Sequence, residues 1–218
     1  MMEFMLLAPL WLPLLLGTLW IGSAMVWELE ITEVARDAAS LYSRGTDFSI
    51  AAGANSDVAA DNAILPNLAV DLGTVGTSGN GVFIFSTVLY VGNSVCAGID
   101  STYGTAGTPG SHTNLCKNWG KFVFTQQYKV GNAGKLTSHF GTAPSGDLDA
   151  TNSYKVDDAK TYVGDTADVS TFSLVPAPTE MGSDGYQSGQ PIYLVEVYFT
   201  NRAEPGYTQG ANYAYAVY

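Results

Sequence analysis

The sequence predicts an α+β protein in which one long N-terminal helix packs on a mostly antiparallel β-sheet domain. Phe4–Trp27 is a run of 24 residues without a charged side chain, and apolar residues then recur at helical spacing as far as Gly45. Beyond Gly45 the chain is rich in glycine and small polar residues, and its apolar segments are short, β-branched and aromatic. Such segments are typical of strands joined by turns. We therefore divide the chain into a helix, residues 1–45, and a domain, residues 46–218.

The predicted helix has two halves with different surfaces. About 20 apolar residues span a bilayer as a helix, so Phe4–Trp27 is long enough to do so. After this run the apolar side chains form one stripe and charged side chains take the other faces, which predicts an amphipathic helix ended by Gly45. We expect the first half to sit in lipid or among other helices, and the second half to lie along the chain's own domain. The stripe consists of Trp27, Ile31, Val34, Ala38, Leu41 and Tyr42.

The composition excludes some partners. The net charge is -11, with only 9 Lys and Arg residues, whereas nucleic acids and anionic lipid surfaces require a basic footprint. Charged residues make up 13% of the chain, and this low content together with many small polar residues suits an extracellular β-domain.

Two cysteines, Cys96 and Cys116, are 20 residues apart. We expect them to form a disulfide in an oxidising compartment, where closing a loop of that size contributes roughly 3 kcal/mol, and to be free thiols in the cytosol.

The domain is predicted to contain about five to seven strands. The strongest is Val82–Val91, whose near-continuous apolarity indicates a central strand buried on both faces. A turn at residues 131–134 suggests a hairpin. Residues 45–81 are expected to be irregular, with one or two short strands near Ile64 and Leu68. The other expected strands are Lys121–Val130, Lys135–Phe140, Val169–Val175, Ile192–Thr200 and Ala211–Val217.

Few residues indicate catalysis or metal binding. His112 and His139 are isolated histidines, and no nucleophile motif surrounds any serine. Asp147 and Asp149 alternate with other oxygen-bearing residues as in a calcium loop, but the central Gly and terminal Glu of such loops are missing. A solvated acidic loop is the simpler interpretation. We expect a protein that is not an enzyme and has no cofactor.

Several positions together resemble a known family. They are Glu3-Phe4, Pro9, Leu15-Leu16-Gly17, Val34 to Ala39, and the late segment Val195-Glu196-Val197-Tyr198. In this pattern the chain resembles the TadE/TadG-like pilins of the tight-adherence (Tad) branch of type IV pili. In that family the acidic residue usually stands fifth in the mature chain, whereas here it stands third.

The resemblance implies a type IV pilin-like fold and a structural role in an adhesive cell-surface filament. Such pilins enter the inner (cytoplasmic) membrane with a short basic leader, which a prepilin peptidase removes. The pilus assembly machinery then moves their helices from the membrane into a helical homo-oligomer outside the cell.

Five residues of the apolar run are candidates for a role in assembly: Glu3, Phe4, Pro9, Pro13 and Gly17. A carboxylate in an apolar bundle is costly unless paired, so Glu3 would pair with a neighbour's N-terminal ammonium, or else lie at the membrane surface. The two prolines would kink or locally melt the helix, or else be tolerated as they are in membrane helices. Gly17 would permit close approach of another helix.

Three hypotheses remain open from the sequence. The first is a pilin that polymerises through residues 3–44. The second is a single-pass anchored extracellular β-domain that binds a ligand and does not polymerise. This hypothesis predicts a basic cluster beside the span. The third is a secreted hydrolase with an N-terminal anchor. This hypothesis predicts a recognisable nucleophile or metal site. Neither feature is found in the sequence, so we favour the pilin.

Overall fold

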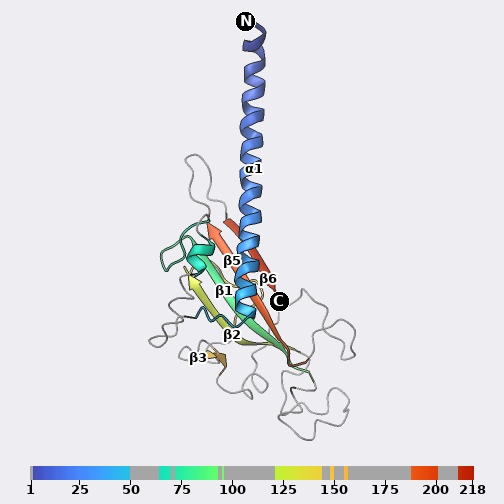
Figure 1. Ribbon diagram of the computed structural model, residues 1–218, viewed down its shortest axis with the longest axis vertical. Coiled ribbons are helices and arrows are strands. Elements are labelled where there is room, and N and C mark those ends of the chain that lie inside the picture. The colour runs from blue at the N-terminus through green and yellow to red at the C-terminus, as the bar shows by residue number, and fades with distance from the viewer. Residues whose placement is uncertain are drawn as a thin grey trace.

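The computed structural model describes residues 2–49, 64–69, 72–92, 95, 121–143, 148–149, 155–156, 188–200 and 211–218. In these residues one long helix packs on an antiparallel sheet, which confirms the α+β prediction (Figure 1). The sheet order is β3-β4-β2-β1-β5-β6, with four long strands and two very short ones. The elements are α1 (Met2–Ser43), β1 (Gly81–Tyr90), β2 (Phe122–Gly131), β3 (Leu148–Asp149), β4 (Lys155–Val156), β5 (Pro191–Thr200) and β6 (Ala211–Val217).

The helix α1 is continuous over 42 residues, in agreement with the prediction for residues 3–44. Its last residue is Ser43, and two residues later Gly45 has a φ of 93°, in the left-handed region that favours glycine. The amide of Gly45 donates to the carbonyl of Tyr42 (3.0 Å), and that of Thr46 donates to the carbonyl of Leu41 (3.2 Å). These two bonds form a Schellman motif, so the predicted stop is confirmed.

Strand β1 lies at the centre of the sheet, between β2 and β5, and pairs with both in antiparallel register. All ten of its residues are buried, as its continuous apolarity predicted. Strands β2, β5 and β6 form within one residue of their predicted bounds. The strand predicted at Val169–Val175 lies outside the described residues.

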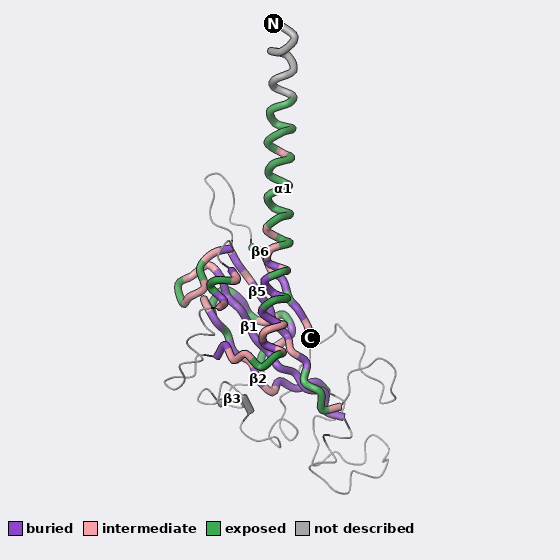
Figure 2. The backbone as a smooth tube through the Cα atoms, in the orientation of Figure 1, coloured by how far each residue is buried: buried purple, intermediate pink, exposed green. Residues whose placement is uncertain are grey.

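One face of the sheet, which we call the helix face, is covered by α1 (Figure 2). The helix packs against β5 and β6, where Ala38 and Ala39 are fully buried together with Val195 and Val197. Over β1 and β2 the cover comes from Phe48 and from a short helical segment, residues 64–68. We expected short strands there. The apolar residues of this segment recur at helical spacing instead, and a proline inside it cannot donate to a sheet.

Tyr42 fixes the end of α1 to the helix face. Its hydroxyl is 2.6 Å from the hydroxyl of Thr87 and donates to Oε1 of Gln126 at 3.0 Å. Its ring contacts the rings of Phe85 and Tyr128 edge-on. Because a buried hydroxyl is costly without a partner, these bonds specify one seating of the helix on the sheet.

The opposite face, which we call the outer face, is covered by the segment after β2. A turn forms here, with the Lys135 amide donating to the carbonyl of Asn132, but the strand predicted at Lys135–Phe140 is wrong. The segment leaves the edge of β2 and crosses the outer face. Its two large apolar residues, Leu136 and Phe140, are four positions apart, and Ser138, which a strand would place between them on the same face, is polar. They are buried against the outer-face side chains of β1 and β5.

Gly131 ends β2 in a conformation that requires glycine. Its φ is 104°, and a Cβ placed on it would lie 2.5 Å from the carbonyl oxygen of Gly81. That carbonyl accepts a bond from the amide of Asn132 at 3.0 Å. The close approach therefore fixes where the chain turns away from β2.

Candidate assembly surface on the N-terminal helix

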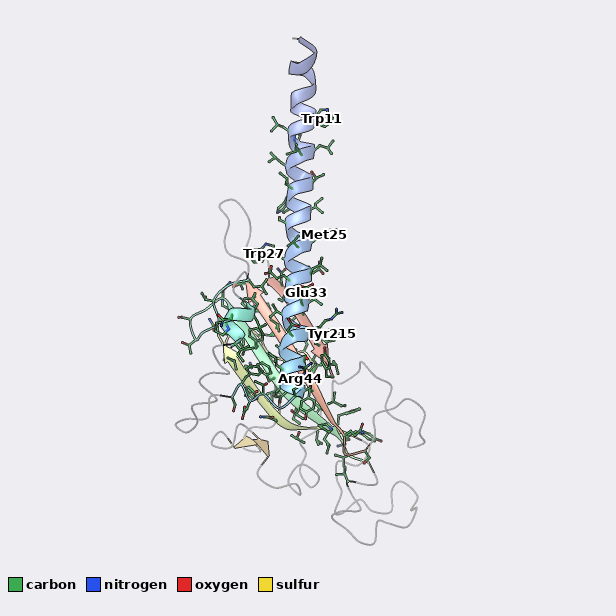
Figure 3. All side chains as sticks on the ribbon, viewed as in Figure 1. Trp11, Met25, Trp27, Glu33, Arg44 and Tyr215 are labelled. Carbon is green, nitrogen blue, oxygen red and sulfur yellow. The ribbon has the colours of Figure 1, made fainter. Side chains whose placement is uncertain are left out.

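The upper half of α1 projects beyond the sheet (Figures 1 and 3). Apart from Trp27, residues 11–29 have almost no contact with the domain, and their large apolar side chains are exposed around the whole helix. Trp11, Leu19 and Leu29 retain 66%, 63% and 66% of their accessible surface. Nineteen helical residues extend about 28 Å, close to the thickness of the hydrocarbon core of a bilayer.

Length and composition make α1 the one helix among the described residues that can cross a membrane. This supports a membrane anchor near the N-terminus. Trp27 is half-buried against the helix-face core, and Ile31, one turn later, is fully buried. The exposed apolar part and the packed part thus meet within about one helical turn, and they are joined without a linker.

The predicted assembly residues all lie in the projecting part. The backbone of Glu3, Phe4 and Pro9 is helical, and their side chains are outside the described residues. Pro13 is exposed, and α1 continues through both prolines as a single helix. A Cβ added to Gly17 would meet no atom within 4 Å, so this position has open space beside it.

The lower half of α1 carries charges on the side away from the sheet. Glu33, Arg36, Asp37 and Arg44 are exposed, whereas Ile31, Val34, Ala35, Ala38, Ala39 and Tyr42 are buried on the opposite side. Figure 3 labels Glu33 and Arg44 along this half. This amphipathic division matches the predicted one.

A buried carboxylate on the outer face of the sheet was not predicted as a site. Glu196, in the middle of β5, is fully buried. Its Oε1 accepts hydrogen bonds from the backbone amide of His139 (2.8 Å) and the hydroxyl of Tyr213 (2.8 Å), and its Oε2 accepts one from the hydroxyl of Ser138. The single acidic residue inside an otherwise apolar strand was the available signal, because such a residue needs buried donors.

The hydrogen bonds among Ser138, His139 and Glu196 are arranged to hold the segment on the sheet, and they differ from those of a nucleophilic serine. The Ser138 hydroxyl donates directly to the carboxylate, and the imidazole of His139 lies over the ring of Tyr213 with centroids 4.2 Å apart. A nucleophilic serine would instead be hydrogen-bonded to the histidine that takes its proton. Burial, and next the charge of Glu196, raise the pKa of Tyr213 well above its ordinary range. Tyr213 therefore stays protonated and acts as a donor.

The remaining predicted sites are not all within the described part of the chain. Cys96, Cys116, His112 and Asp147 lie outside it, so the disulfide stays a prediction. Asp149 lies in the short strand β3, and its side chain is not among those described. Among the described residues no group of three His, Cys, Asp or Glu is placed to hold a metal ion.

Comparison of the chain with models of protein families, with curated proteins and with solved structures finds no match.

Proposed function

We propose that this protein is a structural pilin subunit that polymerises through the upper half of α1 into a type IV, Tad-like filament on the cell surface. The observation that carries the proposal is the exposed apolar upper half of α1, which continues without a break into the half that packs on the domain. The resemblance of the chain's head to TadE/TadG-like pilins supports the same role.

The free energy available from burying the projecting apolar surface favours its contact with lipid or with another protein chain. Eleven large apolar side chains between Trp11 and Leu29 are exposed. Burying each fully contributes about 1.5–3 kcal/mol, so together they would gain roughly 16–33 kcal/mol on leaving water. Lipid provides this contact before assembly, and the same helices of other copies provide it afterwards. Because lipid tails are as apolar as leucine, the hydrophobic effect does not favour a helix bundle over lipid. Close packing and polar pairing between helices determine whether the helix leaves the lipid for the bundle.

Rigid coupling separates a pilin from an ordinary anchor. A membrane anchor functions with any linker between the span and the domain, whereas a subunit of a helical polymer must present its domain in a fixed orientation. Here Tyr42 bonds the helix to two strands, and the helix is continuous from the span to that contact. In the filament the apolar halves would form a central bundle with the domains outside it.

A single-pass anchored binding protein is the second candidate, because its span would look the same. Electron microscopy of material sheared from cells that express this chain separates the two. We expect filaments that contain the chain, and fewer filaments from Glu3→Ala, which removes the proposed pairing with the next copy. A chain that stays entirely in the membrane fraction as single copies would establish the anchored protein and exclude the pilin.

A further inference from the structure

The lower half of α1 and Arg44, the residue directly after it, carry three charges on one line. At about 100° per residue, Asp37 lies about 40° around the helix from Glu33, and Arg44 lies between them at about 20° from each. All three side chains are exposed on the side away from the sheet. We call Glu33, Asp37 and Arg44 the charged stripe. Its acidic part is nearer the membrane end and its basic part nearer the domain end.

The stripe is complementary to a copy of itself that is shifted along the helix axis. Arg44 lies about 10.5 Å below Asp37 and about 16.5 Å below Glu33 along the axis, at 1.5 Å per residue. In a parallel copy displaced by a distance in this range, the acidic pair stands level with Arg44 of the first copy. In a copy with no displacement, like charges face each other.

The fold favours the parallel arrangement. The sheet lies on one side of α1, so in a bundle with the domains outside, the stripe faces inward to the neighbouring helices. An antiparallel pair also brings Glu33 opposite Arg44, but it directs the two apolar halves in opposite directions and leaves both uncovered. Only parallel copies bury these halves against each other.

We infer that Arg44 of one copy binds the Glu33–Asp37 carboxylate pair of the adjacent parallel copy, and that this contact sets the axial offset between subunits at about 10.5–16.5 Å. The inference rests on the proposed function and adds the contact that determines its register. Exposed ion pairs contribute little affinity individually, but they discriminate strongly against arrangements that oppose like charges.

Charge reversal and its compensation test this contact in the purified full-length chain. Polymer formed on detergent removal is measured by sedimentation and electron microscopy. We expect Arg44→Glu to raise the monomer concentration needed for assembly about tenfold, since three carboxylates then meet. The pair Glu33→Lys with Asp37→Lys should do the same, and the triple variant should restore assembly. Added salt should reduce these differences.

Lys135→Glu is the matched control, because it changes the charge equally on an exposed residue of the outer-face segment. Circular dichroism checks that every variant is folded. Wild-type chains that remain single copies would refute the proposed function and this inference with it. If the wild type polymerises, three results refute the inference alone: assembly of Arg44→Glu at the wild-type concentration, equal impairment by Lys135→Glu, or a triple variant that does not recover.

Discussion

Removing the carboxylate of Glu196 should release the segment that covers the outer face. Side chains of three residues on the sheet hold this segment: Glu196, Gln127 and Lys129, whose Nζ donates to the carbonyl of Leu136 at 2.7 Å. Glu196 accepts from Ser138, from the amide of His139 and from Tyr213, so it connects the segment to β5 and β6 at the same time. A second anchor, Gln127, accepts a bond from the amide of Ala143 at 2.8 Å. Glu196→Ala leaves the contacts of Gln127 and Lys129 in place and removes the one made by Glu196.

The expected loss can be worked out from the three bonds. Hydrogen bonds to a charged group contribute about 1.5–3 kcal/mol each, but the alanine variant also avoids the cost of burying a charge, and Ser138 can be solvated. A net loss of about 2–4 kcal/mol follows for attachment of the segment. In Glu196→Gln the amide oxygen can still accept from His139 and Tyr213, and the Ser138 hydroxyl can turn to accept from the amide nitrogen. Its loss should be about 1 kcal/mol.

Hydrogen exchange followed by mass spectrometry on the full-length chain in detergent measures this directly. The amides of His139 and Phe140 are hydrogen-bonded in the part of the segment that Glu196 holds. In Glu196→Ala the exchange of these two amides should accelerate about 30- to 900-fold, the factor that corresponds to 2–4 kcal/mol. The amide of Ala143 bonds to Gln127, which the variant keeps, so its exchange should change less. Amides of β1 should change less. Equal exchange in the Ala and Gln variants, or no acceleration in the segment, would refute the assigned role of this carboxylate.

Three further predictions concern other parts of the fold. Gly131→Ala should lower the free energy of unfolding, measured by denaturation, by more than about 2 kcal/mol, because the added Cβ meets a backbone carbonyl of β1 at a positive φ. Gly134→Ala should lower it by less than about 1 kcal/mol in the same experiment. Stability should fall as the pH rises above about 10, because an unfolded tyrosine then loses its proton while Tyr213 in the folded chain keeps it; Tyr213→Phe should make the pH titration of stability flatter. Deleting residues 1–28 should leave a folded, soluble domain by circular dichroism, whereas deleting residues 1–44 should unfold it, because the buried stripe of α1 is then missing.

The main elements of the fold could be predicted because their residues are nearly all of one kind. A long uncharged run followed by an apolar stripe predicts a helix whose two halves have different environments, and Gly45 marks its end. Strand β1 was predictable as central because its residues are almost all apolar, and every one of them is buried. In such segments local preference and tertiary position point the same way.

The cover of the outer face was not predictable for a physical reason. A turn signal at residues 131–134 shows that the chain changes direction, but it does not show whether the chain then pairs with β2 or crosses the sheet. The choice depends on the apolar outer-face clusters and on Glu196, both of which are distant in sequence. For the same reason a lone acidic residue in an apolar strand signals a need for buried donors, but it does not show which residues supply them.

The packing of α1 also determines when the protein can fold. The helix leaves the ribosome before the strands that cover it, and its buried stripe rests on β5 and on β6, which ends at Val217. Contacts between segments so far apart in sequence close late, because loop-closure entropy opposes them until the intervening chain is ordered. The apolar stripe of α1 therefore stays uncovered through most of synthesis. A chaperone or the bilayer surface must shield it until β6 has been synthesised, and premature stop codons in β6 would expose it permanently.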